Sequence, residues 1–200
     1  MSDIEVIPLG LNLANYPVRE NSGKEYDLVF VGNFSHFPNI DGVFYFITKI
    51  LPLIKRTIPG LSVAIAGAHP PESIKRMAKP GSKITVTGYL GDIKDVYYKA
   101  RVFITPVRFG TGMRYKILEA QALELPVIST SVAAGGIDRR SLIVADTAYD
   151  FSEEIVGLLQ DPSRRFDLAK RGRLSVEKNH DSCVLIEKYE FIYNELLNPS

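Results

Sequence analysis

Residues 108–120 read RFGTGMRYKILEA, and they are the most informative stretch of the chain. They run from the end of an apolar segment, through a turn with two glycines, into a helical pattern. Small residues let a backbone approach a ligand closely, and a helix start presents unpaired N–H groups with a positive dipole. Three cationic side chains lie within this stretch: Arg108, Arg114 and Lys116. The stretch therefore predicts a cradle for a diphosphate.

The polar groups of this stretch also suit the rest of a nucleotide. The N–H groups of Thr111, Gly112 and Met113 can face an anion at the helix start. Lys116 and Glu119 are three residues apart, so they share one face of the helix. A glutamate commonly accepts hydrogen bonds from the ribose hydroxyls of a nucleotide. The alternative is an ordinary helix start with a surface Lys–Glu pair, and the two-glycine turn favours the site.

Outward from this stretch, short β-branched segments alternate with longer helical patterns. Strands are expected at residues 27–32, 61–66, 83–87, 102–105, 126–130 and 142–145. Helices are expected at residues 42–58 with a bend at Pro52, and at 71–78, 92–100, 113–125 and from 149 onward. Parallel strands need helical crossovers, which cover both faces of the sheet. We therefore predict one doubly wound, Rossmann-like α/β domain with a parallel sheet of about six strands and a helical C-terminus.

The first 25 residues differ from the rest, because they contain Pro and Gly and show little periodicity. We expect residues 1–25 to be a linker or an entry strand outside the core and residues 26–200 to form the domain, with its helical tail from about residue 149. In a doubly wound domain, ligands bind beyond the carboxyl ends of the strands. Three loops should converge there: residues 32–39, 88–91 and 106–112.

Composition excludes several classes of protein. Apolar residues make up 46% and charged residues 24% of the chain, as in ordinary globular proteins. The net charge of +1 gives no support for a nucleic-acid partner. One cysteine, with three widely separated histidines, predicts neither a disulfide nor a metal site. With no basic, apolar leader and no run of about eighteen apolar residues, we expect a cytoplasmic protein without a membrane span.

Several short motifs occur in an order that is familiar from one enzyme family. They are VFVG at 29–32, PN at 38–39, LP at 51–52, IAG at 65–67, VTG at 86–88, GTGMRYKILEA at 110–120 and LPVIST at 125–130. Together they resemble the C-terminal domain of retaining GT-B glycosyltransferases of family 4, over about residues 5 to 197. The helix that ends in KILEA, followed by Pro-Val, is the most specific part. IPLGLN at 7–12 is similar to the segment that joins the two domains of such enzymes.

The resemblance implies a site for a UDP- or GDP-linked sugar donor, with no metal or other cofactor. Lys116 would contact the diphosphate, and Glu119, the second acid of the family's Glu-x7-Glu motif, the ribose. Thr111 stands at the position of the first acid, which holds the donor sugar in the family, so no catalytic residue is assigned. Thr111 is expected to cap the helix and to bond a phosphate or sugar hydroxyl instead.

The family often has a cation after its first strand, and the loop after Gly32 has none, so Arg108 or Arg114 is expected to supply that charge. The loop with Tyr89 and Leu90 would receive the base, although an ordinary turn explains it equally well. His36 is expected to be a solvent-exposed loop residue. The candidate nucleotide-sugar-binding residues are Gly32, Tyr89, Leu90, Arg108, Gly110, Thr111, Gly112, Met113, Arg114, Lys116 and Glu119.

A complete GT-B enzyme has two domains, and the 25 residues before the first expected strand are too few for a second one. We therefore expect a donor-binding half that requires an N-terminal acceptor-binding domain or subunit. Any peripheral association with a membrane would take place through that second part. A non-catalytic nucleotide-sugar-binding or regulatory module is the alternative that Thr111 fits. A dehydrogenase is disfavoured, because residues 32–37 do not read Gly-x-Gly-x-x-Gly and no acid ends the second strand.

Overall fold

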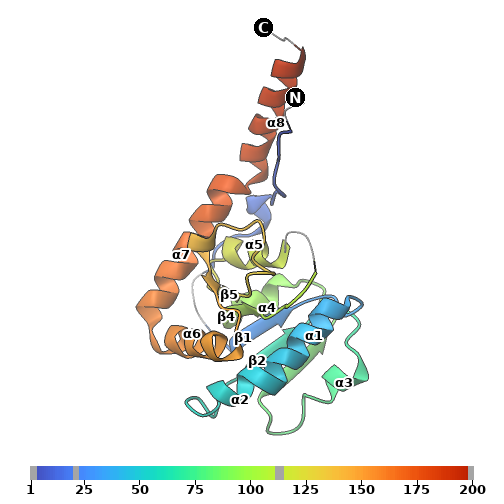
Figure 1. Cartoon of the computed structure of the whole chain (residues 1–200), viewed down its shortest axis with the longest axis vertical. Helices are drawn as coiled ribbons and strands as arrows, with labels where there is room; N and C mark the ends of the chain where they lie inside the picture. Colours follow the sequence, from blue (N-terminus) through green and yellow to red (C-terminus); the bar gives the residue numbers. More distant parts are fainter. Residues whose placement is uncertain (1–3, 20–22, 111–114, 198–200) are drawn as a thin grey trace.

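The computed structural model describes residues 4–19, 23–110 and 115–197. Within these residues, six parallel strands form one sheet in the order β3-β2-β1-β4-β5-β6 (Figure 1). The strands are β1 (Tyr26–Val31), β2 (Val63–Ala66), β3 (Ile84–Gly88), β4 (Ala100–Thr105), β5 (Val127–Ser129) and β6 (Ile143–Val144). This is the strand order of the doubly wound Rossmann sheet, which the sequence predicted. The order reverses between β1 and β4, and a ligand-binding crevice is expected at that point.

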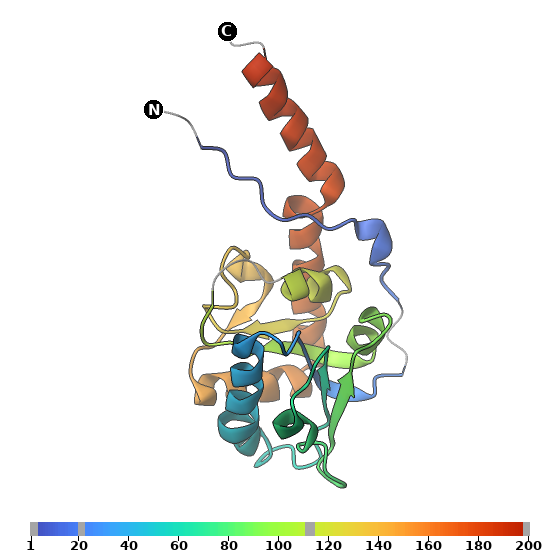
Figure 2. The ribbon, with the colours of Figure 1, turned by 90° about the vertical axis from the view of Figure 1, so that its right-hand side faces the viewer.

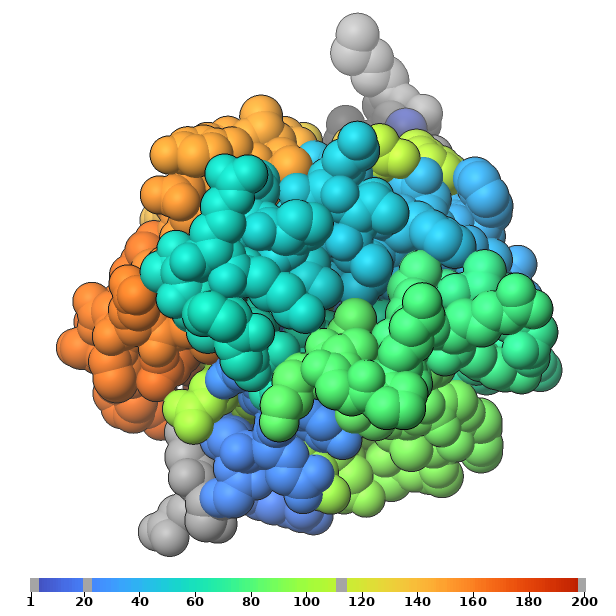
Figure 3. All heavy atoms as spheres, turned by 90° about the horizontal axis from the view of Figure 1, so that it is seen from below, coloured from blue at the N-terminus to red at the C-terminus, as the bar shows by residue number. Residues whose placement is uncertain are grey.

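Helices connect successive strands and extend the chain beyond the sheet. They are η1 (Leu13–Asn15), α1 (Phe37–Tyr45), η2 (Phe46–Ile50), α2 (Leu51–Ile54), α3 (Glu72–Lys75), α4 (Lys94–Tyr98), α5 (Tyr115–Ala122), η3 (Arg139–Ser141), α6 (Ala148–Gln160), α7 (Pro162–Asn179) and α8 (Ser182–Leu197). The last three form the helical C-terminus that the sequence predicted. At the end of the molecule opposite α8, α6 lies against α2 and α7 (Figure 3).

The central strands of the sheet are buried on both faces, because most of their residues are apolar. In β1, Leu28 and Phe30 join a core cluster with side chains of α1, η2, α2 and α6. Val29 and Val31 point to the opposite face and join a second cluster with side chains of α4, α5 and α7. Successive strand residues point to opposite faces, so a continuous apolar strand needs helices on both (Figure 2).

The helix after β1 begins earlier than the sequence analysis predicted. It starts at Phe37 with Pro38 in its first turn, where a proline is favoured because its missing N–H would have no helical partner anyway. Before Pro52 the helix passes through a π turn, in which the N–H of Leu51 donates to the carbonyl of Phe46. The segment Phe37–Ile54 is, among the described residues, the one helix long and apolar enough to cross a membrane. Its buried side chains belong to the core cluster on the sheet, as in the core helix of a globular domain.

The segment before the sheet contributes to the core, which corrects the expectation that it lies outside. Leu11 is fully buried in the second core cluster. Its N–H donates to the carbonyl of His180, and its carbonyl accepts from the N–H of Ser182, at the junction of α7 and α8. From this junction α8 projects away from the sheet, and the N-terminal segment runs beside its base (Figures 1 and 2).

Candidate functional site

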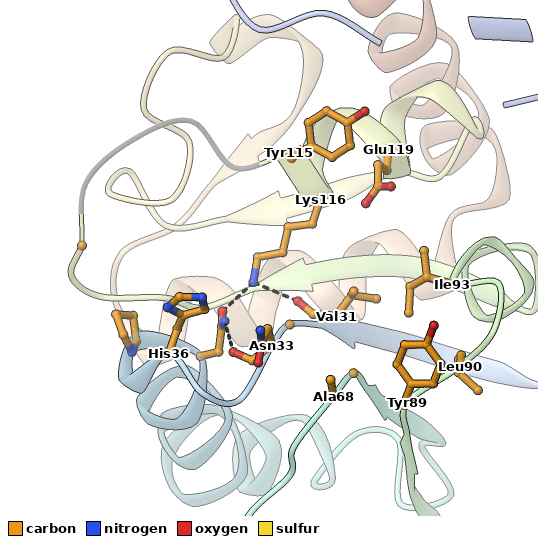
Figure 4. A pocket seen from close by; sticks show the side chains of 15 residues that line it. Val31, Asn33, His36, Ala68, Tyr89, Leu90, Ile93, Tyr115, Lys116 and Glu119 are labelled. Atoms are coloured by element: carbon orange, nitrogen blue, oxygen red, sulfur yellow. Dashed lines mark hydrogen bonds between the residues drawn. The ribbon is translucent and has the colours of Figure 1, made fainter. Parts of the chain in front are cut away.

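A cavity of about 780 Å³ lies at the reversal point of the sheet. Its walls come from the loops after β1, β2 and β3 and from helix α5, which brings Tyr115, Lys116 and Glu119 to one side (Figure 4). The residues that line it are Val31, Gly32, Asn33, His36, Pro38, Asn39, Gly67, Ala68, Tyr89, Leu90, Ile93, Gly110, Tyr115, Lys116 and Glu119. Six candidate residues from the sequence analysis are therefore brought together: Gly32, Tyr89, Leu90, Gly110, Lys116 and Glu119.

Lys116 crosses from α5 to the carboxyl end of β1. Its Nζ donates to the carbonyl oxygen of Val31 and to Oδ1 of Asn39, each at 2.8 Å (Figure 4). The same ammonium lies 4.5 Å from the centre of the Phe30 ring. Asn39 is fixed in turn, because its amide donates to the carbonyl of Asn33 at 2.7 Å. A positive charge is thus held at the mouth of the strand, where an anionic ligand of a doubly wound fold is expected.

Glu119 lies one helical turn after Lys116 and is half-buried. Burial raises the pKa of its carboxyl above the ordinary value, because the charged form loses water. Hydrogen bonds from Tyr16 and Tyr97 and the charge of Lys94 act in the opposite direction on this pKa, and the charge of Asp92 adds to the rise. The hydroxyl of Tyr16 donates to this carboxylate at 3.0 Å, and the carboxylate is a strong acceptor at the edge of the cavity.

Glycines allow the loops after the strands to pack backbone against backbone. Gly67 has a φ of +140°, and a Cβ on it would lie 1.8 Å from the carbonyl oxygen of Gly32. Its N–H donates to the carbonyl of Gly88 at 3.0 Å, so the ends of β1, β2 and β3 are joined here. A Cβ on Gly32 would lie 2.8 Å from Cγ of Asn39, the partner of Lys116. The floor of the cavity thus depends on both glycines.

The other predicted residues divide into three groups. Arg108 does not line the cavity: Nη2 lies 2.6 Å and Nε 3.0 Å from the carboxylate oxygens of Asp41, and the guanidinium stacks on the ring of Tyr45. His36 is exposed, as expected, and it also lines the cavity. Thr111, Gly112, Met113 and Arg114 lie outside the described residues.

The sequence analysis did not predict three contributors to the site. They are the amide of Asn39, the turn after β2 and the hydroxyl of Tyr16, which donates to Oε1 of Glu119 at 3.0 Å. The glycine that ends β2 was a usable signal, because β2 is the neighbour of β1 in this strand order. Within the described part of the chain, no three His, Cys, Asp or Glu side chains are grouped so as to hold a metal ion.

Comparison with known proteins identifies the family. The sequence model of the family described as "Glycosyl transferases group 1" matches residues 25–161, which include the whole sheet and the helix α5.

The chain belongs to the group 1 glycosyltransferases.

Within this family, the chain is 32% identical over 125 residues to CapM, a capsular polysaccharide biosynthesis glycosyltransferase of Staphylococcus aureus; the match covers 58% of this chain and 32% of CapM. A structure of S. aureus TarM with fondaparinux, alpha-GlcNAc-glycerol and UDP is similar in fold, with a TM-score of 0.78, 13% identity, and coverage of 97% of this chain and 40% of that one. The C-terminal domain of LpcC, a group 1 protein of Francisella tularensis, gives a TM-score of 0.67 at 16% identity, with coverage of 86% and 100%.

These comparisons also identify the fold of the chain. Its fold is that of the C-terminal domain of GT-B glycosyltransferases, as the sequence motifs predicted. The chain spans less than half the length of the curated relatives it matches, 43% of one and 32% of the other.

Proposed function

We propose that this chain is the donor-binding half of a retaining GT-B glycosyltransferase of family 4, which transfers a sugar from a UDP- or GDP-linked donor to an acceptor without a metal. The observation that carries the proposal is the pairing of Lys116 and Glu119. One helix presents an ammonium and, one turn later, a carboxylate to a single cavity at the reversal point of a parallel sheet. A nucleoside diphosphate has the matching groups, since its phosphates are anionic and its ribose carries two hydroxyl donors.

In this proposal Lys116 contacts the diphosphate and supplies the charge that a metal supplies in other nucleotide sites. Its ammonium is already held by Val31 and Asn39, so little side-chain freedom is lost when the phosphate binds. Thr111, Gly112, Met113 and Arg114 lie outside the described residues, and their assignment to the phosphate and sugar subsites rests on the sequence alone. Arg108 would join them only by leaving Asp41.

Glu119 accepts hydrogen bonds from the ribose, and the loop with Tyr89 and Leu90 receives the base. Tyr89 is 78% exposed at the rim of the cavity, so its ring is accessible to a base. The structural neighbour TarM was crystallised with UDP, which supports a uridine donor here. GDP remains the second candidate, because recognition of the base by backbone groups would leave little in the side chains to separate the two.

An acceptor-binding domain would complete the enzyme, and the surface of α8 supports such a partner. Large apolar side chains on this helix are 41% to 74% exposed: Val184, Ile186, Tyr189, Phe191, Tyr193, Leu196 and Leu197. Exposed apolar surface of this extent is typical of an interface.

We expect the purified chain to bind UDP or GDP and to transfer sugar poorly or not at all, because the proposal assigns the acceptor-binding groups to a second domain. Calorimetry would measure nucleotide binding, and release of nucleoside diphosphate from UDP-glucose or GDP-mannose would measure transfer. Robust turnover by the chain alone would contradict the donor-half proposal.

A non-catalytic nucleotide-sugar-binding or regulatory module is the second candidate, and Thr111 favours it because the family's first acid is absent there. The two functions separate in the same assay when an acceptor-binding domain from a group 1 enzyme is added. Restored turnover supports the transferase. Nucleotide binding without any turnover supports the module.

Nucleotide affinity should depend on the ionisation of Glu119. Since burial raises the pKa of this carboxyl, it takes up a proton at a higher pH than an ordinary glutamate does, and its affinity for the ribose falls as the pH is lowered. We expect the ratio of UDP affinity between the native chain and Glu119→Gln to be roughly tenfold near neutral pH and to fall toward one as the pH is lowered, starting at a higher pH than for an ordinary glutamate. The ionisation of the phosphate affects both variants equally, so its effect on affinity cancels in this ratio. A ratio that does not vary with pH would contradict the role of Glu119.

The cytoplasmic location also remains a proposal. It is supported by the packing of the apolar helix 37–54 on the sheet. Peripheral association with a membrane would take place through the acceptor half.

A further inference from the structure

Tyr16 joins the N-terminal segment to the candidate ribose site. Its hydroxyl donates to Oε1 of Glu119 at 3.0 Å, although the two residues are 103 positions apart in the sequence. Tyr16 is half-buried and lies just after η1, which is outside the sheet. The contact therefore brings a residue of the N-terminal segment to the carboxylate of Glu119, which lines the cavity.

The direction of this hydrogen bond is fixed by the chemistry of the pair. Burial raises the pKa of the Tyr16 hydroxyl, and the charge of Glu119 raises it further, so the phenol keeps its proton and acts as the donor. A carboxylate has about four acceptor positions, so one bond from Tyr16 leaves capacity for a ribose diol. On the other side, the buried Tyr97 donates to the backbone carbonyl of Lys116 and also lowers the pKa of Glu119.

Several contacts hold Tyr16 in place. Its carbonyl accepts from Nη1 of Arg173 on α7 at 3.1 Å. On one side, the carbonyl of Asn15 accepts from Nζ of Lys94 at 3.2 Å. On the other, the carbonyl of Pro17 accepts from the hydroxyl of Tyr98. The segment is thus tied to α4 and α7 at three consecutive residues, and Tyr16 has a defined position from which to orient the carboxylate.

We propose that Tyr16 is a positioning residue for nucleotide binding: its hydroxyl fixes the rotamer and charge of Glu119 and so couples the N-terminal segment to recognition of the ribose. This inference rests on the proposed function, because it assumes that Glu119 binds the ribose of a nucleotide. Since the same segment pairs through Leu11 with the junction of α7 and α8, displacement of that junction would be transmitted to the ribose site.

The test compares Tyr16→Phe with a matched control, Tyr98→Phe. Both variants remove one hydroxyl and keep the ring, and both loosen the N-terminal segment or its anchor, but Tyr16 alone of the two reaches Glu119. Affinities are measured by calorimetry for UDP and for dideoxy-UDP, which lacks both ribose hydroxyls. We expect Tyr16→Phe to weaken UDP roughly 3- to 10-fold and to leave dideoxy-UDP unchanged, and Tyr98→Phe to change neither. The combination of Tyr16→Phe with Glu119→Gln should be no weaker than Glu119→Gln alone.

The outcomes separate this inference from the function it rests on. If the native chain binds UDP and Glu119→Gln weakens it while Tyr16→Phe does not, the positioning role is wrong and the donor site stands. The positioning role is also wrong if Tyr16→Phe weakens UDP and dideoxy-UDP equally, or if Tyr98→Phe has the same effect, because a loosened segment then explains the result. If the native chain binds neither UDP nor GDP, the proposed function fails and this inference fails with it.

Discussion

Replacement of Lys116 by alanine should weaken binding of UDP roughly 10- to 150-fold, which corresponds to about 1.5–3 kcal/mol for a hydrogen bond to a charged group. The ammonium is the one cation among the described residues that lines the cavity, and it is held at the end of β1 by two hydrogen bonds. Calorimetric titration would measure the affinity. Thermal denaturation would measure the loss of stability, which we also expect because Val31 and Asn39 lose their shared donor.

Arg108→Ala is the matched control for this experiment. It removes a cation from the loop after β4, but the guanidinium is paired with Asp41 and lies outside the lining of the cavity. We expect it to alter UDP affinity much less than Lys116→Ala does. Equal losses in the two variants would show that general charge near the loop, and not the position of Lys116, attracts the nucleotide. Unchanged affinity in Lys116→Ala would contradict its role in the site.

Replacement of Gly67 by alanine should destabilise the fold by roughly 3–5 kcal/mol, because it combines a strained φ with a backbone collision. A Cβ at this position would lie 1.8 Å from the carbonyl oxygen of Gly32, and neither backbone can move without disturbing the joined ends of β1 and β2. For a domain of this size, the change corresponds to a decrease in Tm of roughly 6–20 °C. Circular dichroism during heating would measure it.

Gly60→Ala is the corresponding control, because no atom lies within 4 Å of a Cβ at that position. We expect its Tm to stay close to that of the native chain. A variant Gly67→Ala that melts at the native temperature would mean that the ends of β1 and β2 are less closely packed than described here. It would also remove the reason for a glycine at the floor of the cavity.

The sequence predicted the layered fold because the controlling signals are local. Short apolar segments that end in glycine mark buried parallel strands, and the six strands lie within a few residues of their expected positions. The predicted start of helix α1 at residue 42 was wrong, because proline fits the first turn of a helix and Pro38 therefore belongs to α1 and not to the preceding loop. Leu11 was missed because its burial depends on its pairing with the junction of α7 and α8, which is a tertiary contact.

The site was predictable where its parts share one helix or lie at the ends of strands, as Gly32, Tyr89 and Leu90 do. The spacing of Lys116 and Glu119 on one helix was sufficient to place both on the same cavity. Their partners come from other elements: Asn39 is 77 positions from Lys116, and Tyr16 is 103 positions from Glu119. Arg108 was expected at the phosphates because of its position in the loop, but Asp41, 67 positions away, holds its guanidinium. Such pairings depend on tertiary contacts that spacing does not contain.

The central claim is that the cavity between β1, β3 and α5 holds the nucleoside diphosphate of a sugar donor. The most direct measurement is an amide NMR titration of the isotope-labelled chain with UDP and with GDP. We predict saturable shifts for one of them, concentrated at Gly32, Gly67, Leu90, Lys116 and Glu119. Shifts confined to the outer surfaces of α7 and α8, or no saturable shifts with either nucleotide, would contradict the claim.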